Sequence, residues 1–159
     1  MKRQYLLGLV IGLFLTVVSV PLRAQDRSQI QNLASSLSHR AQDAWSAMQD
    51  ARHSMDLKNN PSARQLYGSL RSFNGRAQQF ARESDEPVEL ATLRLGAQWL
   101  VNHASRIQNL MLKANVPDSV LRGWSETDNS VENLAYAYGF PYQREHGLAR
   151  RSYDKRDNR

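Results

Sequence analysis

Cysteine is absent from this sequence of 159 residues. Its absence excludes disulfide bonds, thiolate-bound metals, covalently attached haem and a cysteine nucleophile, so stability has to come from side-chain packing alone. Glycine and proline are scarce, at 8 and 5 residues, and neither occurs between Asp26 and Lys58. A long stretch without these two residues favours helix over strands joined by turns.

Motifs typical of catalytic sites are also missing. The sequence has no Gly-x-Ser-x-Gly elbow, no phosphate-binding glycine loop and no Glu-x-x-His pair of the kind that holds two irons in helical bundles. Asp50-x-x-His53 is the nearest relative of such a pair, and His39 with Asp43 fits a solvated pair on one helix face. We therefore expect a protein that is not an enzyme and has no resident metal or cofactor.

An excess of charge of one sign is lacking in the central part of the chain. The net charge is +6, yet residues 25–140 contain twelve Lys or Arg and twelve Asp or Glu. Residues 141–159 contain six basic and three acidic residues, and the other three basic residues lie before residue 25. Because the basic excess belongs to the two ends, a sequence-specific nucleic-acid-binding face on the body is disfavoured.

The N-terminus has the pattern of a secretory signal peptide over residues 1–24. Lys2 and Arg3 precede a largely apolar stretch from Tyr5 to Val20, and we expect cleavage after Ala24. This pattern predicts a periplasmic or secreted bacterial protein. The alternative is an uncleaved N-terminal membrane anchor with the domain facing the periplasm, because the apolar stretch is close to the minimum length that spans a bilayer.

Residues 25–140 show the apolar spacing of packed helices. The steps between apolar residues alternate between three and four, most regularly from Leu90 to Ala114. Short links containing Asn60-Pro61 and Pro117 separate the segments, which makes successive helices antiparallel neighbours. The sequence thus predicts an all-α fold, an antiparallel up-down four-helix bundle. Its helices are expected at about 27–58, 61–84, 86–114 and 118–138.

The last of these segments has the least regular apolar stripe. Thr127 and Asp128 interrupt it, and we expect Asp128 to lie at its edge and point to solvent. Gly139 is expected to take a left-handed conformation that ends the helix, with Phe140 folding back onto the last turn. Residues 141–159 have no apolar pattern and predict a disordered, flexible basic tail.

The spacing Trp-x6-Val-x2-Leu-Ala-x2-Tyr in the last helix resembles that of a loose group of small secreted bacterial proteins. Here it is formed by Trp124, Val131, Leu134, Ala135 and Tyr138. In that group, a signal peptide is followed by four helices in two similar hairpins, and the resemblance extends from about Leu37 to Phe140. It implies an envelope protein with a four-helix fold, and it supplies no active-site residues.

Three methionines and one histidine form the candidate ligand site. In an up-down bundle Met55 approaches Met111, and Met48 lies near the level of His103. Thioether and imidazole groups could bind Cu(I) or a haem. Methionine is also an ordinary space-filling residue of helical cores, which is the alternative interpretation of the same four residues.

The C-terminal tail is the candidate binding segment for anionic partners. Its cations are interleaved with Tyr142 and Tyr153 and could contact lipid head groups, lipopolysaccharide or acidic polymers. These cations are Arg144, Arg150, Arg151, Lys155, Arg156 and Arg159. A terminus that only increases solubility is the alternative.

The sequence therefore predicts a non-enzymatic, secreted or periplasmic helical bundle with a structural or protein-interaction role. Its expected partner is a protein or an anionic component of the envelope, with membrane contact only through an uncleaved N-terminus or the tail. The alternatives are a bundle that carries copper or haem and a chaperone-like binder that offers an exposed apolar helix face. The oligomeric state is left open.

Overall fold

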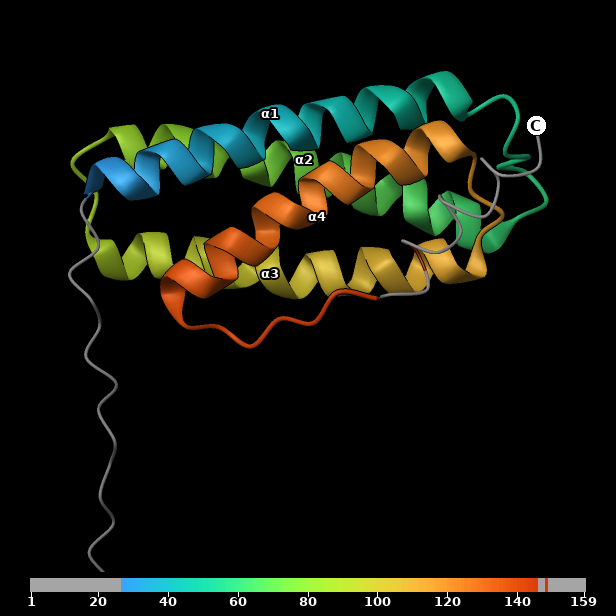
Figure 1. Ribbon diagram of the computed structural model, residues 1–159. Helices are drawn as coiled ribbons and strands as arrows, with labels where there is room; N and C mark the ends of the chain where they lie inside the picture. Colours follow the sequence, from blue (N-terminus) through green and yellow to red (C-terminus); the bar gives the residue numbers. More distant parts are fainter. Residues whose placement is uncertain (1–26, 146–147, 149–159) are drawn as a thin grey trace, which may run out of the picture.

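The computed structural model describes residues 27–145 and 148 (Figure 1). Within these residues the chain forms helices only. They are α1 (Arg27–Ala51), α2 (Pro61–Asp85), α3 (Leu90–Lys113) and α4 (Asp118–Tyr138). The predicted all-α class with four packed helices is confirmed for this part of the chain. The expected signal peptide, residues 1–24, lies outside the described residues.

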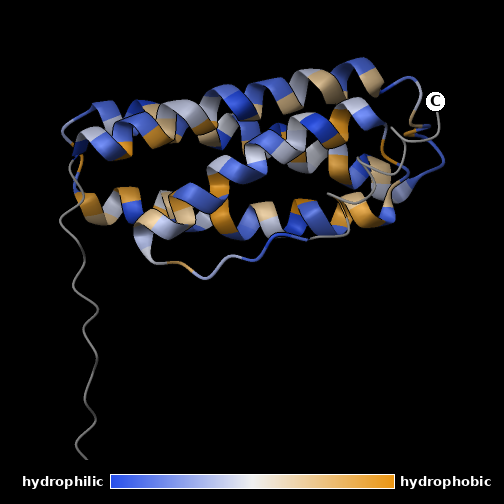
Figure 2. Ribbon diagram, viewed as in Figure 1, coloured by the Kyte–Doolittle hydropathy of each residue, from blue (hydrophilic) through white to orange (hydrophobic). Residues whose placement is uncertain are grey.

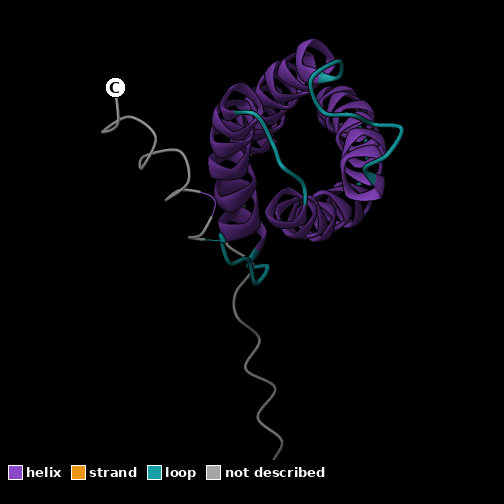
Figure 3. Cartoon of the chain, turned by 90° about the vertical axis from the view of Figure 1, so that its right-hand side faces the viewer, coloured by secondary structure: helices purple, strands orange, loops and turns teal. Residues whose placement is uncertain are grey.

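Each helix packs against the helices next to it in sequence, and α1 also packs against α4 (Figure 3). Apolar residues recur every three or four positions along each helix, among polar residues (Figure 2). They therefore line one side of the helix, and this side faces the common core. None of the helices in the described residues is long and apolar enough to cross a membrane.

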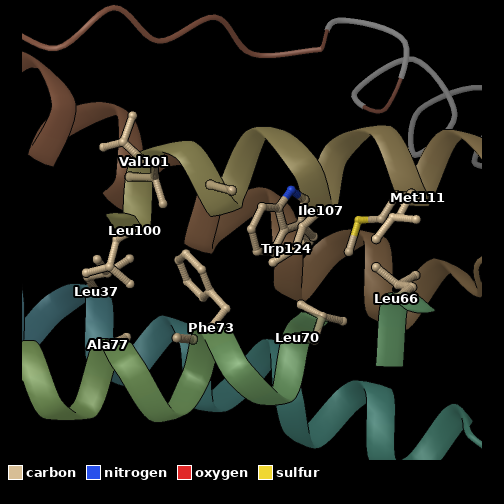
Figure 4. Close-up of a cluster of buried hydrophobic side chains, with 14 of the residues drawn as sticks. Leu37, Leu66, Leu70, Phe73, Ala77, Leu100, Val101, Ile107, Met111 and Trp124 are labelled. Atoms are coloured by element: carbon tan, nitrogen blue, oxygen red, sulfur yellow. The ribbon is translucent and has the colours of Figure 1, made fainter. Parts of the chain in front are cut away.

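The core is filled by the residues of the apolar seams (Figure 4). Its largest buried side chain is Trp124, and the ring of Phe73 meets the indole edge to face, with 5.5 Å between the ring centroids. Met48 and Met111 are fully buried in the same core. Aromatic rings in edge contact stabilise a core beyond their burial, by roughly 0.5–1.5 kcal/mol per pair.

A glycine allows α1 and α4 to approach each other closely. A Cβ placed on Gly123 would lie 3.1 Å from the Cα of Ala44. One turn further along α4, the hydroxyl of Thr127 donates to the backbone oxygen of Arg40 at 2.8 Å and also lies 2.9 Å from the oxygen of Gly123. The polar residue in the irregular stripe of α4 is therefore buried and forms an interhelical hydrogen bond.

The first helix is shorter than the sequence predicts, because it ends at Ala51 and not near residue 58. The backbone N–H and the hydroxyl of Ser54 both donate to the oxygen of Ala51, at 3.0 and 2.8 Å, and the chain then turns. Asp56 has a positive φ of 41° in this turn, and its carboxylate accepts bonds from the side chain of Asn59. Met55 is buried even though it lies outside the helix.

The third helix begins at Leu90, four residues after the expected start. The N-cap position is held by Glu89, and its side chain makes no capping bond. The hydroxyl of Ser84, near the end of α2, donates to the backbone oxygen of Ala81. Leu90, expected in the buried seam, is 56% exposed because the first turn of α3 extends past the core.

The end of α4 has the predicted glycine cap. Gly139 has a φ of 67°, and Phe140 N–H bonds to the oxygen of Ala135 at 2.9 Å. Phe140 stacks on Tyr138, and the guanidinium of Arg94 lies 4.6 Å from the centre of the Phe140 ring. The chain then turns back along α3 (Figure 1).

Substituting Gly123 tests the close approach of α1 and α4. We expect Gly123→Val to lower the free energy of unfolding by about 1–3 kcal/mol, because the added carbons meet the backbone of α1. Gly68→Val is the matched control, since a Cβ at Gly68 would meet nothing within 4 Å and helix propensity changes little. Urea unfolding followed by circular dichroism measures both, and equal effects of the two substitutions would contradict the prediction.

Candidate functional site

A cluster of buried and partly buried polar side chains joins α3, α4 and the segment that follows α4. We call residues 139–145 the closing segment, and Gln108, Asp128, Tyr142 and Arg144 the polar cluster. The closing segment lies beside α3 (Figure 1), and the backbone N–H of Glu145 bonds to Oε1 of Gln108 at 3.2 Å. Residues from three parts of the chain therefore meet at one carboxylate.

Asp128 is the centre of the polar cluster and is only 5% exposed. Its Oδ1 accepts hydrogen bonds from the phenol of Tyr142 and from Nε2 of Gln108, the latter at 2.6 Å. Its Oδ2 accepts a bond from Nε of Arg144 at 3.1 Å. The expectation that Asp128 points to solvent is wrong, because the returning chain covers it and supplies its partners.

Arg144 is also engaged in this cluster. Besides Asp128, it lies 3.6 Å from Oε2 of Glu132, the exposed acid one turn further along α4. Burial raises the pKa of the Tyr142 phenol well above its usual value of 10, and the negative charge of Asp128 adds to this effect. The phenol thus stays protonated and remains a donor. The arrangement neutralises and holds a carboxylate, and it leaves no oxygen of Asp128 without a partner for acid–base chemistry.

The tail predicted from residue 141 onward differs from the structure at its beginning. Residues 141–145 lie against the bundle, and Leu148 belongs to the buried core. Of the proposed polyanion-binding residues, Arg144 pairs with acids of α4. The other five lie outside the described residues: Arg150, Arg151, Lys155, Arg156 and Arg159.

The four residues of the candidate copper or haem site lie in different surroundings. Met48, Met55 and Met111 are buried in the core. His103 is half-buried between α2 and α3, where Nε2 lies 3.3 Å from the backbone oxygen of Ser69 and the ring stacks on Trp99. The described residues contain no group of three or more His, Cys, Asp or Glu that could hold a metal. Binding of copper or haem by the methionines stays a prediction.

The environment of His103 favours its neutral form. Burial lowers its pKa from the usual 6.5, the hydrogen bond to Ser69 opposes this shift, and the charge of Arg106 adds to it. Stacked rings continue inward from Trp99 through His103 to Phe73. His103 is thus part of the packing between α2 and α3.

Several large apolar side chains remain at the surface. They are Leu90, Leu95, Trp99 and Tyr136, of which Leu95 and Trp99 are 68% and 40% exposed. Leu95 and Trp99 lie one turn apart on α3, outside its buried seam. They form an exposed apolar pair on one side of α3, and seam spacing alone did not single them out.

Gln108 and Tyr142 are the members of the polar cluster that sequence reasoning missed. Gln108 directly follows the seam residue Ile107, and its carboxamide is buried. Tyr142 lies in a segment without apolar periodicity, so spacing gave no signal for it. The available signal was the carboxylate within the stripe of α4, since a buried charge needs partners.

Removing the carboxylate of Asp128 tests the polar cluster. We expect Asp128→Ala to lower the free energy of unfolding by about 2–4 kcal/mol, because Gln108, Tyr142 and Arg144 lose a common acceptor. Hydrogen exchange in the closing segment should rise as well. Glu132→Ala, at the exposed end of the Arg144 pair, is the control and should change stability by no more than about 0.5 kcal/mol. Unchanged exchange in Asp128→Ala would contradict this role.

A titration tests the environment of His103. Because its pKa is lower in the folded than in the unfolded chain, its contribution to stability is fully present above about pH 6.5. That contribution is lost as the pH falls through the folded-state pKa. We expect the His103 ring signals in NMR to titrate below pH 6.5. A midpoint for His103 at or above pH 6.5 would contradict the assignment.

The chain matches no protein-family model, no curated protein and no solved structure with which it was compared. Its function is therefore inferred from its own residues and their geometry.

Proposed function

We propose that this protein is a non-enzymatic helical bundle that acts outside the cytoplasm as a structural or protein-interaction module. Its partner is a protein or an anionic component of the envelope, contacted through the basic residues that follow the closing segment. The N-terminal segment directs export, with cleavage after Ala24 as the proposed outcome and retention as an anchor as the alternative.

The observation that carries this proposal is the use of buried polar groups for packing. Thr127 bonds to α1, Asn74 bonds to Gln42, and Asp128 binds the closing segment. These side chains connect helices and the closing segment, which is what a rigid scaffold requires. The groups that we propose to contact a partner are the basic side chains that follow Glu145.

We further propose that the bundle has the antiparallel, up-down arrangement. Contacts early in one helix and late in the next support it. The side chain of Gln31 bonds to the oxygen of Ser84, and Arg94 bonds to the oxygen of Tyr138. The contact of Trp45 with Tyr67, nearer the other ends of α1 and α2, agrees with the same order.

Neutralising the tail tests the proposed contact with anionic partners. The five cations beyond Glu145 are changed to glutamine in the full chain, and Arg144 is retained because it holds Asp128. We expect the variant to elute from a sulfated-polysaccharide column at a clearly lower salt concentration than the unchanged protein, because screening by salt competes with charge contacts. Fewer envelope proteins should co-purify with it.

Arg122→Gln is the control for this experiment, because it removes an exposed cation of α4 far from the tail in sequence. It should elute close to the unchanged protein. Equal elution of the tail variant and the unchanged protein, with the same co-purifying partners, would refute a binding role for the tail. Mass spectrometry of the isolated protein identifies its N-terminus and so separates cleavage from anchoring.

A further inference from the structure

The positive and negative charges of residues 25–140 cancel in number, but they lie on different helices. Neither residues 61–82 nor α3 contain an Asp or Glu. Seven cations lie in these two stretches: Arg64, Arg71, Arg76, Arg82, Arg94, Arg106 and Lys113. The acids Glu83, Asp85, Glu86 and Glu89 lie together near the link between α2 and α3. Helix α4, by contrast, has four acids and one arginine.

Two apolar side chains lie on the basic side. Leu95 and Trp99 of α3 are exposed, and the indole of Trp99 stacks on His103 with ring centroids 4.4 Å apart and planes 11° apart. His103 in turn bonds to the backbone of Ser69 on α2. Trp99 is thus held at the outer edge of the contact between α2 and α3, and we call this surface the α2/α3 face.

Two exposed cations lie in line with Trp99 on α3. Arg106 follows Trp99 by seven residues, which is two helical turns, and Lys113 follows Arg106 by seven more. Within the described residues, neither cation belongs to an ion pair of the bundle. Their charges are therefore available to a partner.

We propose that the α2/α3 face binds the surface of an anionic lipid bilayer, with Leu95 and Trp99 entering the interface. Arg106 and Lys113 contact lipid phosphates there. Charge complementarity favours an anionic partner over a neutral one. The exposed apolar pair favours a bilayer over an acidic polymer, because indole and aliphatic groups gain from the interface between head groups and acyl chains.

Binding through this face requires both kinds of residue. Two inserted side chains are a small apolar area, and two cations are screened by salt, so each set alone gives weak attachment. The helix pair would lie along the bilayer surface and would not cross it. From the sequence, membrane contact is expected only at the chain ends, because the charges of residues 25–140 sum to zero. That sum does not show that cations and acids lie on different helices.

This inference rests on the proposed role as an interaction module and goes beyond it, because it adds a surface on the bundle to the tail. The two are separable in the full chain. The tail is neutralised by the five glutamine substitutions described above, and the face is changed in two variants. One is Leu95→Ser with Trp99→Ser, and the other is Arg106→Gln with Lys113→Gln.

The experiment measures co-sedimentation with vesicles of phosphatidylglycerol and phosphatidylcholine, compared with phosphatidylcholine alone. The unchanged protein should bind only the anionic vesicles. At low salt we expect the two-charge variant to bind roughly 30-fold more weakly. The variant without Leu95 and Trp99 should bind at least about 10-fold more weakly. The tail variant should retain binding through the face.

Quenching by brominated acyl chains locates Trp99. Tryptophan fluorescence of the unchanged protein should fall on anionic vesicles. Trp99→Phe should bind but lose most of this quenching, because Trp124 is buried and Trp45 lies partly buried on α1, against Tyr67. The matched control is Arg122→Gln with Tyr136→Ser, which removes an exposed cation and an exposed aromatic ring from α4. It should bind within about twofold of the unchanged protein. Circular dichroism verifies that each variant is folded.

Three results would overturn the inference. The first is binding by both face variants equal to that of the control, and the second is vesicle binding that disappears only with the tail charges. The second result would leave the tail proposal intact. The third is binding of a soluble sulfated polysaccharide, lost in the two-charge variant, without binding to anionic vesicles. That result would identify a polymer as the partner.

Discussion

The edge contact between Phe73 and Trp124 connects α2 and α4, whose backbones are not neighbours in the described part of the bundle. Helix α2 contacts α1 and α3, and helix α4 contacts the same two helices. The rings of Phe73 and Trp124 span the centre between them, with centroids 5.5 Å apart. In a chain without disulfide bonds, this contact across the core limits how far any one helix can shift. The positions of the outer faces depend on it.

Much of the fold followed from spacing, and the reason is physical. Alternating steps of three and four place residues such as Leu100 and Ile107 on one side of a helix, and both are buried. Gly139 followed by Phe140 likewise predicted the end of α4, because the turn there needs the left-handed conformation that glycine adopts readily. Such features depend on residues a few positions apart, which a sequence displays directly.

The polar cluster depended on residues that are distant in sequence and could not be predicted in this way. Asp128 finds its partners 20 residues before it, in Gln108, and 14 and 16 residues after it, in Tyr142 and Arg144. Periodicity says nothing of such contacts. The same limit applies to charge, because whether cations of α2 and α3 share a face depends on which helices are neighbours. Leu90 shows the opposite error, since a residue in phase with the seam is exposed where the helix extends past the core.

The hydrogen bond between Glu145 and Gln108 has a consequence for affinity. It holds the closing segment beside the half of α3 that carries Arg106 and Lys113, and the basic residues of the proposed tail site follow this segment in sequence. Two attachments joined in this way would not bind independently, because the first brings the second within reach of the same surface. The second attachment would then occur at a high effective concentration, and modest individual affinities multiply into avidity. A bond inside the fold would thereby increase how strongly the proposed face and the proposed tail site act together.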